Sequence, residues 1–186
     1  MNPIKNQKNL ETKIDEIRNF SYAYIEKYSP SKQQLRTYLF KKLIKKEQKT
    51  TSKKEIFDLI DTVISNLVDQ KFISDEFYSD SKSKAFYRRG YSLNKIRFNL
   101  LKKGIDQKYI KASISKIKEN EADPDFFSAI KLCKKRRIGP IRTESNRPLF
   151  YKKDISILAR SGFTYELSKK ILEISKDDFL KICKLL

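Results

Sequence analysis

Apolar residues recur every three or four positions along most of the chain, which is the spacing that places side chains on one face of an α-helix. The first three such series begin at Ile14, Leu35 and Ile56. Only 4 Gly and 5 Pro interrupt the pattern. No segment alternates apolar and polar residues between hairpin turns, as a half-buried β-strand would. The pattern therefore predicts an all-α fold.

Two short motifs each occur twice. Gly104-Ile105-Asp106 and Gly162-Phe163-Thr164 both place an apolar residue between a glycine and a helix-capping residue, and they lie 58 residues apart. The segment that begins at Ser31 is similar to the one that begins at Ser92, 61 residues later. The spacing predicts three tandem three-helix repeats that stack into an elongated, curved, right-handed-type helical array.

The capping residues and prolines set the expected boundaries. Ser74 is placed to cap a helix, and Pro124 suits the first turn of another. The predicted divisions are a flexible N-terminus over residues 1–13, repeat 1 over 14–72, repeat 2 over 73–120, and repeat 3 with an extra C-terminal helix over 121–186. A Lys-rich link over 45–54 joins two helices of repeat 1.

The charge of the chain points to an anionic partner. Its 186 residues include 42 Lys and Arg against 23 Asp and Glu, a formal charge of +19. Such an excess attracts nucleic acid, an anionic membrane surface or an acidic protein. Because part of the excess reflects a Lys-rich overall composition, the positions of the cations tell more than their total.

Several kinds of site are excluded by the composition. The chain contains no His and only 2 Cys, which removes His-based catalysis and any four-ligand Cys/His zinc site. Cys133 and Cys183 are expected to be reduced and buried. The carboxylates occur singly or at helix starts, and no Gly-rich phosphate loop is found. We expect no enzymatic activity, no metal and no cofactor. Without an apolar leader or a spanning segment, we also expect a cytoplasmic protein with no membrane contact.

The cations that we expect to form an interaction surface lie in two clusters. They are Arg88, Arg89, Lys95, Arg97, Lys102 and Lys103 in repeat 2, and Lys134, Lys135, Arg136, Arg137 and Arg142 in repeat 3. At a helix C-terminus the second cluster could simply stabilise the helix dipole. We favour a surface aimed at phosphates or acidic side chains. The nearby aromatic residues Tyr87, Tyr91 and Phe98 could stack on bases, but we expect them to pack in the core.

Three segments resemble the RecX family, whose members regulate the recombinase RecA. They run from Asp69 to Phe77, from Arg89 to Ile105, and from Cys133 to Arg142 together with Ala159 to Phe163. The resemblance covers most of residues 18–174, and the middle segment is the most specific.

The resemblance implies a regulatory protein that is not an enzyme. RecX-like proteins consist of three tandem three-helix repeats, bind in the groove of RecA filaments on single-stranded DNA, and inhibit ATP hydrolysis and strand exchange. This places the expected role in DNA repair, recombination and the SOS response. RecA is the expected partner, together with single-stranded and, weakly, duplex DNA; a monomer is the expected state. The basic motif positions of the family fall on Arg89, Arg97, Lys103 and Arg137. The long 45–54 link and the helix over 177–186 depart from the family pattern.

Two other classes of function stay open. A plain DNA-binding protein could use the helix from Ser92 to Gly104 and the helix that follows Asp106 as a helix-turn-helix unit. It would bind duplex DNA with sequence preference, whereas a filament regulator would bind with little preference and strong salt dependence. An adaptor for another acidic protein is supported by charge alone.

Overall fold

The computed structural model describes residues 3–46 and 52–185. Over these ranges the chain contains ten α-helices and one 3-10 helix, and no strand is present in them. The prediction of an all-α fold is therefore confirmed. The centre of the expected 45–54 link, residues 47–51, lies outside the described residues.

The helices follow one another with short connections. The N-terminal ones are α1 (Pro3–Tyr28), α2 (Lys32–Lys46) and α3 (Lys53–Asp69). The middle ones are α4 (Asp75–Arg88), α5 (Leu93–Leu101) and α6 (Gln107–Asn120). The C-terminal ones are α7 (Pro124–Arg136), η1 (Gly139–Ile141), α8 (Asn146–Arg160), α9 (Tyr165–Glu173) and α10 (Lys176–Lys184). Helix α1 thus begins within the 1–13 segment that was expected to be flexible.

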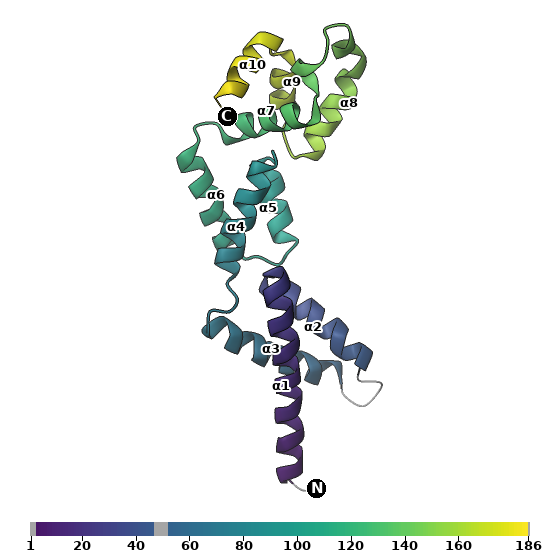
Figure 1. Ribbon diagram of the computed structural model, residues 1–186, viewed down its shortest axis with the longest axis vertical. Coiled ribbons are helices and arrows are strands. Elements are labelled where there is room, and N and C mark those ends of the chain that lie inside the picture. Colours follow the sequence, from purple (N-terminus) through teal and green to yellow (C-terminus); the bar gives the residue numbers. More distant parts are fainter. Residues whose placement is uncertain (1–2, 47–51, 186) are drawn as a thin grey trace. The chain divides into compact units, whose positions relative to one another are not determined.

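The chain divides into two compact units. The first contains Met1–Tyr78 and Lys103–Ile105, and the second contains Ser79–Lys102 and Asp106–Leu186. In the first unit α1, α2 and α3, drawn in purple to blue in Figure 1, contact one another. Their apolar faces form one core, in which Leu35, Leu39 and Ile60 are fully buried.

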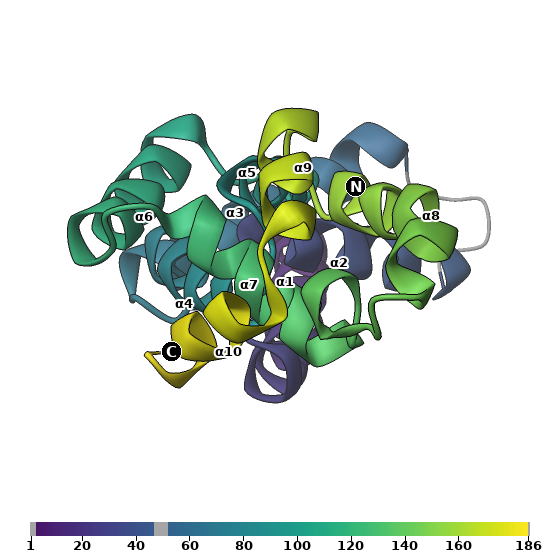
Figure 2. The ribbon, with the colours of Figure 1, turned by 90° about the horizontal axis from the view of Figure 1, so that it is seen from above.

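The second unit has its largest core at the C-terminal end. Helices α7, α8, α9 and α10 and the short η1 surround buried apolar residues such as Ile130, Leu158 and Phe179. Figure 2 shows α8 and α10 on different sides of α9. Helices α4 and α6 are joined instead through small polar residues: Ser79 Oγ lies 2.9 Å from Ser113 Oγ, and both side chains are buried.

The helix starts follow the capping pattern of the sequence. Ser92, Asp106 and Thr164 each accept a hydrogen bond from an amide in the first turn of the helix that follows. Helix α7 ends at a residue other than glycine. The helix ends at Arg136, and Arg137 takes the left-handed conformation with φ 52°. This turn lets the Ile138 amide donate to the Cys133 carbonyl at 3.1 Å and buries the Ile138 side chain.

The N-terminus of α2 is completed by residues from much later in the chain. The Lys32 amide donates to Asp75 Oδ1 at 2.9 Å, and the Ser31 hydroxyl donates to the Lys103 carbonyl at 2.8 Å. Gly104, at φ +73°, lies so close that an added Cβ would be 2.5 Å from Gln33 Cβ. We call this set of contacts, which lies within the first unit, the first junction.

The N-terminus of α5 makes the same kind of contacts inside the second unit. The Leu93 amide donates to Asp125 Oδ1 at 2.8 Å, and the Ser92 amide donates to the Ser161 carbonyl at 3.2 Å. Gly162, at φ +91°, packs against Ser92, and an added Cβ would lie 2.4 Å from its Oγ. We call this the second junction. Both junctions thus use an aspartate from the start of a later helix and a glycine turn to close a helix N-terminus.

The second junction predicts that Gly162→Ala destabilises the protein. The left-handed backbone disfavours any Cβ, and this Cβ would also collide with Ser92 Oγ and with Lys95 Cβ at 2.8 Å. We expect a loss of about 2–4 kcal/mol in the free energy of unfolding, measured by urea denaturation. The exposed Ala159→Ser variant is the control and should change stability by less than about 0.5 kcal/mol. An unchanged denaturation midpoint for Gly162→Ala would mean that the glycine turn does not hold this junction.

Both cysteines are buried in the C-terminal core, as expected. Burial raises the pKa of Cys133 to about 12, with smaller contributions from Asp154 and Cys183. Burial also raises the pKa of the Cys183 thiol. Because the thiolate is the reactive form, both thiols are held in the unreactive state around neutral pH.

We therefore expect Cys133 to react slowly with a disulfide reagent in the folded protein. The Cys183→Ser variant leaves Cys133 as the single thiol, so its reaction with Ellman's reagent can be followed alone. The thiol should react at the rate of global unfolding at neutral pH and rapidly in denaturant. A fast reaction without denaturant, at the rate of a free thiol in solution, would show that this core is open to solvent.

Candidate interaction surface

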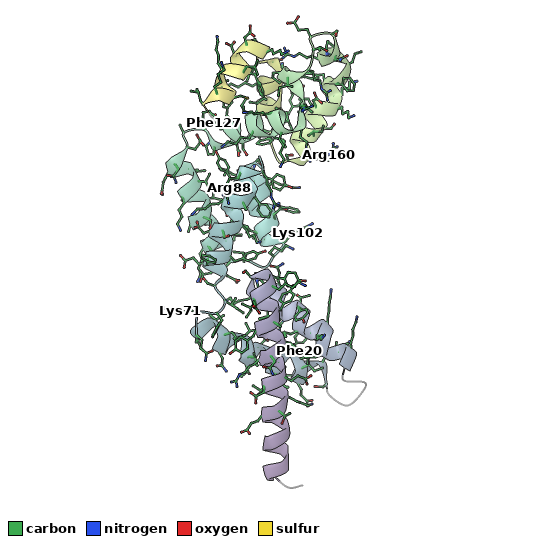
Figure 3. The ribbon with its side chains drawn as sticks, in the orientation of Figure 1. Phe20, Lys71, Arg88, Lys102, Phe127 and Arg160 are labelled. Carbon is green, nitrogen blue, oxygen red and sulfur yellow. The ribbon has the colours of Figure 1, made fainter. Side chains whose placement is uncertain are left out.

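The first predicted cluster begins at the C-terminal end of α4, which lies against α7. Arg88 is the last residue of α4 and Arg89 follows it, and both side chains are exposed. Gly90 packs against the α7 backbone, and the Ser128 hydroxyl donates to the Tyr91 carbonyl at 2.9 Å. In Figure 3 Arg88 lies at the α7 end of α4, whereas Lys102 lies at the other end of α5.

The second predicted cluster, apart from Arg142, lies at the C-terminal end of α7. Lys131, in the preceding turn, lies over the ring of Tyr87 of α4, with Nζ 4.8 Å from the ring centroid. Lys135 lies one turn further along the same face of α7 and is exposed, as are Arg136 and Arg137. Lys134 is partly engaged, because its Nζ donates to the Cys183 carbonyl at 3.2 Å. The contact between α4 and α7 therefore places Lys131, one turn before Lys135, over the ring of the residue that precedes Arg88.

Tyr87, whose ring contacts Lys131, also forms a hydrogen bond with the segment that precedes α7. Its hydroxyl donates to the Glu121 carboxylate at 2.9 Å. Burial raises the pKa of Tyr87, and the hydrogen bond to Glu121 adds to the effect. Tyr87 and Tyr91 are both half-buried and pack as expected, with Tyr91 stacked on Phe86.

The expectation that Phe98 packs in the core is wrong. Its side chain is 49% exposed, because the buried face of α5 carries Ile96 and Leu100. At 100° per residue Phe98 is about 200° from Ile96 around the helix, and therefore points away from the core. The Nζ of Lys102 is 4.8 Å from its ring centroid, and that of Lys95 is 5.8 Å away. Two predicted site cations thus lie beside an exposed aromatic ring.

The remaining cations of the first cluster are also free of carboxylates. Arg97 on α5 and Lys103 after it have exposed side chains, and neither forms an ion pair with any carboxylate in the part of the chain that the structure describes. Only the backbone of Lys103 is used internally, by Ser31. Their charges are therefore available to a partner.

Arg142 has a different environment from the other candidates. Its Nε and Nη2 donate to the two carboxylate oxygens of Asp154 at 2.7 and 2.9 Å. Asp154 is 1% exposed and also accepts the Gly139 amide at 2.9 Å. The hydrogen bond that Arg142 donates to Asp154 raises the pKa of Arg142. Arg142 thus closes the turn between α7 and α8, and we treat it as a structural residue.

Two further cations lie beside this surface. Lys131 belongs to the same run of cations in the sequence as Lys134 to Arg137, and its spacing from Lys135 gives the two a shared helix face. Sequence reasoning missed the other. Arg160 ends α8 with an exposed side chain, and Figure 3 shows it at the end of α8 that faces α5. The second junction puts it there, because Gly162 packs against Ser92 and Lys95.

No group of three or more Cys, Asp and Glu side chains within 3–46 and 52–185 is placed to hold a metal ion. Among the described helices none is both long and apolar enough to span a bilayer.

The chain is similar in sequence to a known regulatory protein. The protein named "Regulatory protein RecX" of Myxococcus xanthus (strain DK1622) is 24% identical to it over 159 residues, which cover 84% of each chain. The resemblance to the RecX family is confirmed. No family model matches the chain, and no solved structure matches it. The name of the RecX relative describes a regulator and no catalytic activity.

We expect Asp154→Ala to be among the most destabilising substitutions in the C-terminal core. It removes the acceptor of the Gly139 amide and leaves the Arg142 guanidinium partly buried without its partner. The free energy of unfolding should fall by about 3–5 kcal/mol in urea denaturation. The matched control is Glu173→Ala, which breaks the exposed pair with Lys169 and should cost less than about 0.5 kcal/mol. Equal costs for the two substitutions would contradict the role given to Arg142 and Asp154.

Proposed function

We propose that this protein binds the recombinase RecA and inhibits its ATPase and recombination activities, as a regulator of DNA repair and the SOS response. Two observations together support this proposal. The chain is similar over most of its length to a regulatory protein RecX. The residues at the basic motif positions of that family, Arg89, Arg97, Lys103 and Arg137, have exposed side chains.

The proposed binding surface consists of cations with exposed side chains, together with the half-buried Lys95. They are Arg88, Arg89, Lys95, Arg97, Lys102, Lys103, Lys135, Arg136 and Arg137, with Lys134 at the edge. Side chains of this kind gain affinity by displacing counterions from phosphates or by meeting carboxylates on a protein. A filament of RecA on single-stranded DNA offers both chemistries in its groove, and we place this surface there.

The two junctions support the tandem-repeat part of the proposal. Each closes a helix N-terminus with an aspartate and a glycine turn, at Asp75 and Gly104 in one case and at Asp125 and Gly162 in the other. Three repeats linked in this way would touch several RecA protomers at once. The combined avidity would exceed that of any one contact and would oppose the protomer movements that ATP turnover needs.

A DNA-binding protein is the second candidate. Helices α5 and α6 contact each other across a short turn, and α6 carries exposed lysines at Lys108, Lys111 and Lys118. A helix-turn-helix function places these side chains in the major groove and requires sequence preference on duplex DNA. A filament regulator requires neither contacts in the major groove nor a sequence preference.

The first measurement is ATP hydrolysis by the RecA of the same organism on single-stranded DNA, titrated with this protein below filament stoichiometry. The wild-type chain should inhibit hydrolysis. The triple variant Arg89→Glu, Arg97→Glu, Lys103→Glu should need about tenfold or more protein for the same inhibition, because three attractive contacts become repulsive.

The control variant carries the same change of formal charge elsewhere in the chain. Lys152→Glu, Lys176→Glu and Lys184→Glu alter exposed lysines of α8 and α10, and this variant should stay within about threefold of wild type. If both variants inhibited hydrolysis equally poorly, the loss of inhibition would be explained by net charge alone. Wild-type protein that binds DNA without slowing hydrolysis would replace the RecA proposal with the DNA-binding one.

A further inference from the structure

Helix α5 carries an exposed apolar patch on a strongly basic element. Phe98 and Leu101 lie one turn apart and are 49% and 42% exposed. Helix α5 contains no acidic residue, and it carries Lys95 and Arg97. An exposed apolar pair of this kind, surrounded by one sign of charge, is a common feature of protein interfaces, where an apolar centre is enclosed by a polar rim.

The two lysines are arranged around the Phe98 ring. Lys95 precedes it by one turn and Lys102 follows it by one turn, so the ring lies between them along the helix. Their Nζ atoms are 5.8 and 4.8 Å from the ring centroid. Neither lysine forms an ion pair with a carboxylate among residues 3–46 and 52–185. The patch therefore combines an apolar centre with two ammonium groups that lack an anionic partner within the described chain.

This arrangement favours a protein partner over a nucleic acid. A base that stacked on Phe98 would have to compete with the two ammonium groups that lie over the ring. Leu101 has no aromatic face and gains nothing from stacking. An aliphatic or aromatic side chain can instead pack on the exposed edges of Phe98 and Leu101, while carboxylates beside it pair with Lys95 and Lys102.

We propose that Lys95, Phe98, Leu101 and Lys102, which we call the α5 patch, bind a protein segment in which an apolar side chain is flanked by carboxylates. The inference rests on the proposed function in one respect, since it places this segment on RecA. Phe98 and Leu101 supply the affinity by burying apolar surface. The two lysines select an acidic segment and raise the rate of association.

Direct binding of full-length protein to DNA-free RecA of the same organism tests the α5 patch. We expect Phe98→Ala and Leu101→Ala each to weaken binding about tenfold or more, measured by fluorescence anisotropy. Phe98→Leu keeps an apolar contact without an aromatic ring and should stay within about threefold of wild type. The matched control is Phe77→Ala, which removes an aromatic side chain that is 72% exposed on α4 and should leave binding unchanged.

A fluorescein-labelled oligothymidylate is the second probe for the same variants. If the patch binds protein, all of them should bind the oligonucleotide within about twofold of wild type. Loss of oligonucleotide binding by both Phe98→Ala and Phe98→Leu would mean that Phe98 stacks on bases, and would overturn the inference. Full RecA binding by Phe98→Ala and Leu101→Ala, with thermal unfolding as in wild type, would also overturn it.

Failure of the two proposals can be told apart. Wild-type protein that binds RecA through the α5 patch but does not slow ATP hydrolysis would overturn the proposed inhibition and leave the patch in place. Inhibition that persists in Phe98→Ala with unchanged RecA affinity would remove the patch and leave the inhibition. A wild-type chain that does not bind RecA at all would overturn both.

Discussion

A carboxylate from a later helix closes the N-terminus of α2 and, in the same way, that of α5. The first amides of a helix have no partner inside it, and a buried one without a partner costs roughly 1–3 kcal/mol. At both junctions the missing acceptor is an aspartate at the start of a later helix, Asp75 for α2 and Asp125 for α5. Burial raises the pKa of Asp125, and the bond from the Leu93 amide opposes that effect. The rest of each junction follows from this contact, because the glycine turns at Gly104 and Gly162 are where the backbone must approach that same helix end.

The junctions also explain why the cations are not used in internal bonds. With helix ends satisfied by aspartates and serines, the basic side chains of α5 and of the α4 end are not needed for internal bonds. Arg142, after η1, differs from them because it pairs with the buried Asp154. A chain with a formal charge of +19 keeps most of that charge on its surface, where self-repulsion is screened by salt and an anionic partner is attracted.

Local patterns in the sequence predicted the helices and their caps well. Ser92, Asp106 and Thr164 work as caps because the side chain and the amide are only a few residues apart. The aspartate contacts of the junctions span 43 and 32 residues, so no local pattern identifies which helix Asp75 and Asp125 complete. The same is true of Arg142 and Asp154, which meet across a turn. Phe98 was misjudged for another reason: its helical phase relative to Ile96 and Leu100 already placed it on the outer face, but aromatic residues are usually buried.

Because the N-termini of α2 and α5 depend on later residues, their contacts form in a fixed order during translation. Synthesis proceeds from the N-terminus, so Leu93 at the start of α5 is made 32 residues before the carboxylate of Asp125 is available. Helix α2 waits for Asp75 and then, 72 residues after Ser31, for the Lys103 carbonyl. Each of these N-termini is completed only when residues of the next group of helices have left the exit tunnel. The nascent protein therefore closes from its N-terminal end in steps, and each step is made by the segment that follows.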